Sequence, residues 1–218
     1  MKRFAVIGLS TFGYYLTKSL FDAGHEVIAI DQDRQRIQSI SSSATQAVIL
    51  NATDKEQLRS LGLESMDSVI ISTGTNLSAS VLIAFYLKEM GVKHIIAKAL
   101  DEDHSQILEK LGVNEVIQPE RDMAFRLAKS LISGNILDYV PLDDNHNLIQ
   151  FAAPASFQGK SLKDLDLRAR YNINVIAIEE LVPYRFILAP TADFILKESD
   201  ILIVLGASQD IEKFQKVK

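Results

Sequence analysis

The stretch Val6-Ile7-Gly8-Leu9-Ser10-Thr11-Phe12-Gly13 lies between an apolar run and a helix-forming pattern that covers residues 14–23. A strand, a glycine-containing turn and a helix in this order form a phosphate-binding turn, for which the usual pattern is Gly-x-Gly-x-x-Gly. Here Ser10 replaces the middle glycine, and its Cβ occupies space that glycine leaves to a pyrophosphate. A working loop, in which the Ser10 hydroxyl donates to a phosphate, and an empty, vestigial loop are therefore both open interpretations.

A second apolar run, residues 26–31, ends in Asp31. A carboxylate at this position accepts hydrogen bonds from a ribose hydroxyl pair, and it disfavours a 2′-phosphate at the same place. Gly8 permits the tight turn, Gly13 permits close packing of the helix on the sheet, and the helix start offers amides to a phosphate. The loop and the acid together predict a nucleotide site.

Strand and helix patterns alternate through the first 119 residues. Strand-like runs cover residues 3–8, 26–31, 47–51, 68–72, 94–97 and 115–118, and helical patterns cover residues 14–23, 34–41, 55–61, 77–90 and 104–111. This alternation predicts right-handed βαβ units and a parallel sheet covered on both faces. Four helical patterns are followed by a glycine that can end a helix in the left-handed conformation: Gly24, Gly62, Gly91 and Gly112. The predicted fold class is α/β, with a Rossmann-like, doubly wound parallel sheet.

The pattern changes after Pro119. A longer helical pattern covers residues 121–133 and ends at Gly134. Strand-like runs then cover residues 137–142, 148–153, 173–179, 185–189 and 200–205, with a turn cluster at 143–147 and short helices at 162–166 and 209–214. We therefore predict a nucleotide-binding domain at 1–119, a crossover helix at 120–136 and a small α+β domain at 137–218.

The helical pattern at 77–90 is apolar on nearly every side. Leu77, Val81, Ala84, Phe85 and Lys88 trace one stripe, and further apolar residues lie on the other sides. Such a helix is expected to be covered twice, by the sheet and by a second surface. That surface is either the protein's own core or another subunit.

Composition excludes several classes of function. The net charge is −5 and the basic residues are scattered, so no nucleic-acid partner is expected. The chain has no cysteine, which excludes disulfides and thiolate metal sites and suits a reducing cytoplasm. No apolar run approaches the ~20 residues of a membrane span, so we expect no direct membrane insertion. The four histidines are widely spaced, so a histidine metal site is not expected either.

The sequence favours a binding module over an enzyme. A dehydrogenase needs a general acid or base beside the nicotinamide, carried by a second domain. Residues 137–218 are too few for the usual substrate domain, and their one histidine, His146, falls in the turn cluster. Glu179 and Glu180 alternate sides on a strand and do not converge. A small NAD-dependent oxidoreductase and a free-standing nucleotide-binding protein remain the alternatives.

Several motifs, in the right order, resemble the regulator-of-K⁺-conductance (RCK) proteins of the TrkA/KtrA type. They are the loop at 8–13, Asp31, Asn-Ala-Thr-Asp at 51–54, Ser-Thr-Gly-Thr-Asn at 72–76, Ile-Ala-Lys-Ala at 96–99 and Pro-Glu-Arg-Asp-Met at 119–123. The likeness covers the whole chain. It implies a cytosolic gating subunit of a bacterial Ktr or Trk potassium uptake system, located at the inner face of the cell membrane. It also implies homodimers that assemble into an octameric ring beneath a membrane K⁺ channel subunit of the KtrB/TrkH type.

The resemblance implies an adenine nucleotide, ATP, ADP or NAD(H), as the ligand. Asp31 would hold the ribose, Asn51 and Ala52 would lie near the adenine, and Lys98 would reach into the crevice. Glu120 would approach the terminal phosphate or an associated divalent or sodium cation, and is the candidate metal ligand. The remaining nucleotide-site residues are Gly8, Ser10, Thr11, Phe12, Gly13, Gln32, Thr73 and Gly74.

Two positions depart from the pattern Gly-x-Gly-Arg-Phe-Gly that close relatives carry. Ser10 stands for the middle glycine, and Thr11 stands for the arginine that contacts the phosphates. Loss of this charge-assisted contact removes roughly 1.5–3 kcal/mol. We therefore predict reduced affinity for a triphosphate, with ADP, AMP or NAD(H) relatively favoured, or an empty site.

In Gram-positive members of the family the small lobe dimerises and binds cyclic di-AMP. The matching residues here are Leu162, Lys163, Arg168, Asn174, Val175 and Pro190, with Lys163 in place of an apolar residue. Arg168 suits a phosphate, and Asn174 can pair with an adenine edge. Equally, the leucines of this segment suit a core position, and Arg168 suits the solvated face of a turn.

Overall fold

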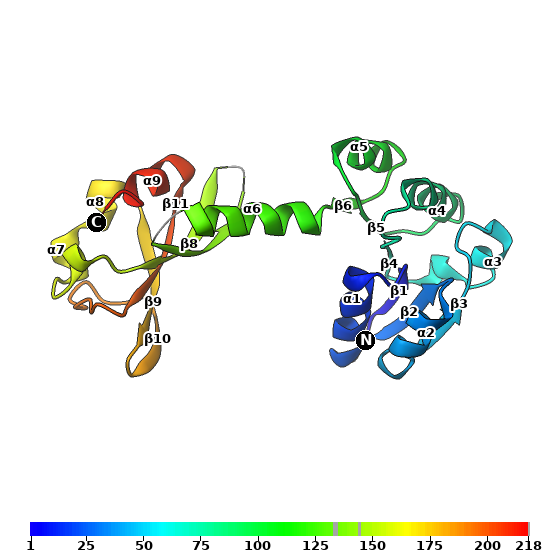
Figure 1. The fold of residues 1–218 in the computed structure, drawn as a ribbon, viewed down its shortest axis with the longest axis horizontal. Helices are drawn as coiled ribbons and strands as arrows, with labels where there is room; N and C mark the ends of the chain where they lie inside the picture. Colours follow the sequence, from blue (N-terminus) through cyan, green and yellow to red (C-terminus); the bar gives the residue numbers. More distant parts are fainter. Residues whose placement is uncertain (133–134, 144, 218) are drawn as a thin grey trace. The chain divides into compact units, whose positions relative to one another are not determined.

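The computed structural model describes residues 1–132, 135–143 and 145–217 (Figure 1). The chain forms two compact units, Met1–Pro119 and Glu120–Lys218. Ser133 and Gly134, the predicted end of the crossover helix, lie outside the described residues, as does Asp144 of the predicted turn cluster. In the described part of the chain, no helix is long and apolar enough to cross a membrane.

The first unit is built on a parallel sheet of six strands in the order β3-β2-β1-β4-β5-β6. Its strands are β1 (Arg3–Ile7), β2 (Glu26–Asp31), β3 (Gln46–Ile49), β4 (Ser68–Ile71), β5 (Ile95–Lys98) and β6 (Glu115–Ile117). The chain places β2 and β3 on one side of β1 and then crosses to β4 on the other. This order confirms the predicted doubly wound fold. It also creates a topological switch point at the carboxyl ends of β1 and β4, where ligands bind in such sheets.

Helices cover both faces of this sheet. Apolar residues of α1 (Thr11–Asp22) and α2 (Arg34–Ile40) pack on one face against Val6, Val27 and Ile70. On the other face, α3 (Lys55–Arg59), α4 (Leu77–Glu89) and α5 (Glu102–Lys110) pack against Ile7 and Ile71. The four glycines predicted to end helices all have φ between 62° and 82°, which confirms the left-handed helix ends.

Helix α1 begins at Thr11, three residues before the helical pattern predicted. Ser10 is its N-cap, with extended dihedral angles of −60° and 177°. Thr11, Phe12 and Gly13 therefore belong to the first turn of the helix, not to the loop. The prediction missed this start because glycine at the third helical position argues locally against a helix.

Of the stripe noted in the sequence of α4, only Ala84 belongs to the face that the structure buries. Its buried residues are Ser80, Ile83, Ala84 and Leu87, spaced at i, i+3, i+4 and i+7. Phe85, which was placed in the stripe, is 47% exposed. A helix that is apolar on several sides has no unique buried face in its sequence pattern, and contact with the sheet selects one.

The second unit holds an antiparallel sheet of five strands in the order β10-β9-β11-β8-β7. The strands are β7 (Ile136–Pro141), β8 (His146–Ala152), β9 (Asn174–Leu181), β10 (Tyr184–Leu188) and β11 (Ile201–Ala207). Helices α7 (Leu162–Leu165), α8 (Leu167–Tyr171) and α9 (Ser208–Phe214) contribute to its core around Phe151 and Leu202. Helix α6 (Pro119–Ile132) precedes β7, and β9 and β10 form a hairpin (Figure 1).

Two details of this unit differ from the sequence analysis. His146 and Asn147 start strand β8 instead of completing the turn, and Leu142 donates its amide to the His146 carbonyl at 2.9 Å. Arg168 lies on α8, a helix that the sequence pattern did not indicate. Asp166, with φ of 42°, separates α7 from α8, and an aspartate in the left-handed conformation gives a weaker signal than a glycine.

Candidate nucleotide site

A cavity of about 220 Å³ opens at the carboxyl ends of β1 to β4, on the sheet edge where the switch point lies. Six of the residues predicted to bind nucleotide line it: Gly8, Asp31, Gln32, Asn51, Ala52 and Thr73. They lie at or directly after the carboxyl ends of four different strands. The parallel sheet brings them together because every parallel strand ends at the same edge.

Close packing requires glycine at the first and last positions of the motif, Gly8 and Gly13. Gly8 has φ of 95°, and a Cβ there would lie 2.3 Å from the Ser72 carbonyl oxygen. A Cβ on Gly13 would lie 2.0 Å from the Gly8 carbonyl oxygen. The first and last positions of the motif therefore admit only glycine in this backbone, whereas the middle position holds a serine.

Asp31 is 8% exposed and its carboxylate is held in place. Its Oδ2 accepts the Leu9 amide at 2.7 Å, and its Oδ1 accepts the Asp33 amide at 2.9 Å. The Nη1 of Arg36 lies 3.5 Å from Oδ2. An ionised carboxylate has about four lone-pair sites, so it can still accept the hydroxyls of a ribose.

The wall of the cavity after β3 combines a polar and an apolar residue, Asn51 and Ala52. The Asn51 side-chain oxygen accepts the amide of Thr53 at 3.1 Å and its hydroxyl at 2.8 Å. This arrangement commits the oxygen of Asn51 and leaves its NH₂ group as a hydrogen-bond donor. Ala52 beside it is buried and offers an apolar surface to the face of a base.

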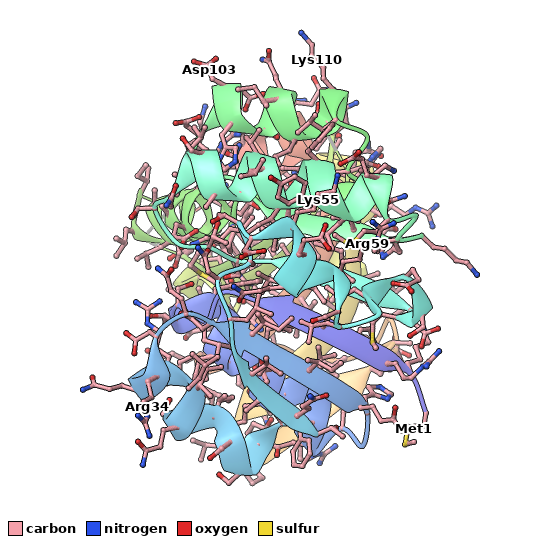
Figure 2. All side chains as sticks on the ribbon, turned by 90° about the vertical axis from the view of Figure 1, so that its right-hand side faces the viewer. Met1, Arg34, Lys55, Arg59, Asp103 and Lys110 are labelled. Carbon is pink, nitrogen blue, oxygen red and sulfur yellow. The ribbon has the colours of Figure 1, made fainter. Side chains whose placement is uncertain are left out.

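The structure adds Arg36 and Asn76 to the residues that line the cavity. Asn76 caps α4, and its side chain accepts the Ala79 amide at 3.0 Å. Arg36 was missed because the residues predicted for this part of the site were only Asp31 and Gln32. Arg34 lies at the periphery of the first unit (Figure 2). The usable signal was a cationic side chain in the first turn of the helix that follows Asp31.

The other predicted residues do not line this cavity. The Ser10 hydroxyl is 3.3 Å from the Ser72 carbonyl oxygen and 3.2 Å from the Ser72 hydroxyl. Thr11 is exposed on the first turn of α1, Phe12 follows it, and Gly74 faces Ser10. Lys98 is buried at the end of β5. Glu120 belongs to the second unit.

The six residues matched to a second ligand occupy three parts of the second unit. The amides of Leu162 and Lys163 donate to carbonyls of Phe194 and Ala192 at 3.0 and 2.8 Å, which places the start of α7 beside the chain that follows Pro190. Arg168 is exposed on α8, and Asn174 and Val175 start β9. Asn174 lines a cavity of about 380 Å³ that no other member of the set lines. Among the described residues, no cluster of three or more histidine, aspartate or glutamate side chains is arranged to hold a metal ion.

The chain matches two family models. Residues 4–119 match the TrkA-N domain and residues 148–218 match the TrkA-C domain. Ktr system potassium uptake protein C of Bacillus subtilis (strain 168) is 41% identical over 215 residues, covering 99% of this chain and 96% of that protein. Ktr system potassium uptake protein A of the same organism is 38% identical over 214 residues, covering 98% and 96%.

Among solved structures, the GsuK channel bound to NAD aligns with a TM-score of 0.65 and 16% identity, over 96% of this chain and 38% of that one. This likeness is one of fold. The sheet order and the two family matches define a regulator-type protein with a nucleotide-binding fold. The chain belongs to the TrkA/KtrA family of potassium uptake proteins, which confirms the resemblance found in the sequence.

Proposed function

We propose that this chain is the nucleotide-sensing, cytosolic regulatory subunit of a bacterial potassium uptake system. Two potassium uptake proteins match it over nearly their full length. The observation that carries the sensing role is the cavity at the switch point, with the buried carboxylate of Asp31 at its side. In this role the chain binds a ligand without transforming it, and its conformation controls a membrane K⁺ channel subunit.

The ligand that fits this cavity is an adenine nucleotide. Asp31 binds the ribose hydroxyls, Asn51 and Ala52 contact the base, and the first turn of α1 receives the phosphate. When a nucleotide with more than one phosphate binds, Lys98 and Glu120 act on the phosphates beyond the first, Glu120 through a divalent or sodium cation. Thr11 lacks the charge of the arginine found in close relatives, so the triphosphate gains less here than in those proteins.

A binding titration on the full chain tests the sensing role. Isothermal titration with AMP, ADP, ATP and NAD is expected to give saturable binding for at least one of them. Asp31→Ala should remove it, because the ribose then loses its acceptor. Asp22→Ala is the matched control, since Asp22 pairs with Lys18 on the surface of α1. Equal binding by Asp31→Ala and wild type would refute the proposed site.

The regulatory role requires copies of this chain to assemble with one another and with a membrane subunit. We propose homodimers that form an octameric ring and associate with the inner face of the membrane through the channel subunit. Light scattering with and without the bound nucleotide should report a ring-sized particle, and co-purification should recover the membrane subunit. A substrate-dependent change in nicotinamide absorbance would instead favour the oxidoreductase alternative.

A second ligand, cyclic di-AMP, is proposed for the small lobe. Its support is the retention of Arg168, Asn174 and Pro190 at the positions matched to the family's residues. Equilibrium dialysis with labelled cyclic di-AMP should show uptake by wild type and loss in Arg168→Ala. The neighbouring Arg170→Ala is the control, because Arg170 stacks over Tyr171 at 5.6 Å. Absence of uptake by wild type would end this proposal.

A further inference from the structure

The two loops at the switch point are joined by a pair of serines. Ser10 comes from the turn after β1, and Ser72 comes directly after β4. The Ser10 hydroxyl lies 3.2 Å from the Ser72 hydroxyl and 3.3 Å from the Ser72 carbonyl oxygen. Ser72 is fully buried, and its own amide donates to the Ile7 carbonyl at 2.7 Å. Ser10 is therefore anchored to a rigid part of the sheet edge.

This serine bridge lies where a longer nucleotide would have to pass. The cavity is lined by Gly8 and Thr73 at this end and does not extend along Ser10 or Gly74. A Cβ built on Gly74 would lie 4.0 Å from the Cβ of Ser10, so the serine side chain faces the glycine of the opposite loop. In doubly wound sheets a dinucleotide crosses between these two loops, and glycine at the middle position leaves room for its pyrophosphate.

The bridge also leaves one phosphate position accessible. Ser10 caps α1, but its side chain makes no hydrogen bond to the amides of that helix because it is directed to Ser72. The first turn of α1 contains no acidic residue. A single phosphate attached to a ribose on Asp31 can therefore meet the amides at the helix start without displacing the bridge.

We propose that the Ser10–Ser72 bridge ends the site after the first phosphate and makes it selective for a nucleoside monophosphate, AMP, over ADP, ATP and NAD. This inference rests on the proposed nucleotide-sensing function and specifies its ligand. A second phosphate requires Ser10 to leave Ser72, and the Cβ still occupies the space of the missing glycine. The site then senses the monophosphate form of adenine nucleotides.

Titration of the full chain with all four nucleotides tests this selectivity. Wild type is expected to bind AMP about tenfold more tightly than ADP, ATP or NAD, the equivalent of about 1.4 kcal/mol. Ser10→Gly should raise the affinity for ADP and NAD by about the same factor and leave AMP unchanged. Ser10→Ala removes the bridge but keeps the Cβ, so its gain in affinity for ADP and NAD should be smaller. Ser42→Gly, a change on the exposed segment η1 (Ser41–Ser43), controls for the flexibility that glycine adds.

The possible outcomes distinguish a failure of the proposed AMP selectivity from a failure of the proposed nucleotide-sensing function. Wild type that binds ADP, ATP or NAD as tightly as AMP overturns the selectivity and leaves the sensing role intact. A Ser10→Gly variant that changes all four affinities equally also overturns it. Absence of binding of any nucleotide to wild type and to Ser10→Gly refutes the sensing role itself. If circular dichroism shows that Ser10→Gly does not fold, Ser10→Ala is used to test the selectivity. Its affinity for ADP and NAD should still be higher than that of wild type.

Discussion

At the scale of single residues, the site depends on side chains that fix one another before any ligand arrives. Asp31 is held by two backbone amides and approached by Arg36, whose guanidinium is also 3.8 Å from Asp33. The side chain of Arg36 is 51% exposed, so it lies at the mouth of the cavity and not in its floor. A planar guanidinium in this place can stack on the face of a base.

Arg36→Met should therefore weaken AMP binding by about fivefold, which corresponds to about 1 kcal/mol of stacking. Arg36→Lys should lose nearly as much, because lysine keeps the charge but has no planar group. Arg34→Met, on the same helix outside the cavity, is the control. Calorimetry with AMP and with adenosine gives the measurement. A loss seen with AMP and not with adenosine would show that Arg36 contacts the phosphate instead.

Gly8→Ala should destabilise the first unit by about 3 kcal/mol, because it combines a left-handed backbone with a clash against the Ser72 carbonyl. Gly24→Ala is the matched control. Gly24 also has a positive φ, of 82°, but a Cβ there would meet nothing within 4 Å, so about 1 kcal/mol is expected. Urea unfolding followed by circular dichroism measures both. Equal losses would show that close packing at Gly8 contributes nothing.

His104 makes the stability of the first unit depend on pH. Burial lowers the pKa of His104, an effect that the nearby Asp101 carboxylate partly offsets. Its Nδ1 accepts the Leu100 amide at 3.2 Å, and its Nε2 has no partner among the described residues. The unfolded histidine binds a proton near its ordinary pKa of about 6.5, and the folded one only at lower pH. Stability is therefore complete above about pH 6.5 and falls as the pH drops toward the lowered pKa.

In His104→Gln the side-chain oxygen can still accept the Leu100 amide, but the residue does not titrate. Its unfolding free energy should change less than that of wild type between about pH 7.5 and about pH 5.5. Urea titrations at the two values provide the comparison. A variant that is as sensitive to pH as the wild type would assign the effect to other groups.

At the scale of elements, α6 is attached to β7 by polar contacts. No residue of α6 is buried, within the residues that the structure describes for it. The Nε of Arg126 is 2.7 Å and its Nη2 is 2.5 Å from the two oxygens of Asp138, and the Lys129 ammonium lies 3.7 Å from the centre of the Tyr139 ring. A bidentate ion pair and a cation–π contact fix the orientation of the helix more than they add to stability.

Asp138→Asn should loosen α6, seen as faster amide hydrogen exchange along the helix. The hydrogen bond from Arg126 holds the pKa of Asp138 below its ordinary value. This contribution is therefore present above the ordinary carboxyl pKa and is lost as the pH falls through the lowered one. The exposed Asp193→Asn serves as the control. If exchange in α6 is the same in both variants, the ion pair does not hold the helix.

At the scale of the whole molecule, the two units have separate cores. The clusters of the first unit contain residues up to Val116, and the cluster of the second contains residues from Ile136 onward. Each unit therefore has the buried apolar area of a domain of its own, so the chain is expected to unfold in two steps.

A bound nucleotide should raise the stability of the first unit and leave that of the second unchanged. A ligand that binds the folded first unit raises its stability by about 2.7 kcal/mol at one hundred times the dissociation constant. Scanning calorimetry with AMP should move the transition of the first unit and leave the second in place. Phe214→Ala, in the core of the second unit, identifies the other transition. A single transition that moves as one would show that the units unfold together.

Much of the fold was determined by the sequence alone. Strands and helices alternate, glycines end the helices, and Asp31 follows the second strand, all of which are local patterns with a direct physical cause. The parallel sheet, Gly8 and Asp31 followed from them, whereas the family and the other residues that line the cavity followed from the resemblance of several motifs to a known family. Boundaries were less certain, as the early start of α1 and the unpredicted helix α8 show, because helix ends depend on capping and on left-handed residues other than glycine.

The tertiary structure decided which contacts the key side chains make and which helix faces are buried. Sequence left open whether Ser10 donates to a phosphate or blocks it, and the nearness of Ser72, 62 residues away, directs the hydroxyl across the crevice. The tertiary structure also selected the buried face of α4. In each case the deciding contact joins segments distant in the chain or alternatives that are locally equal, and local preferences carry no information about such contacts. Packing between elements supplies it.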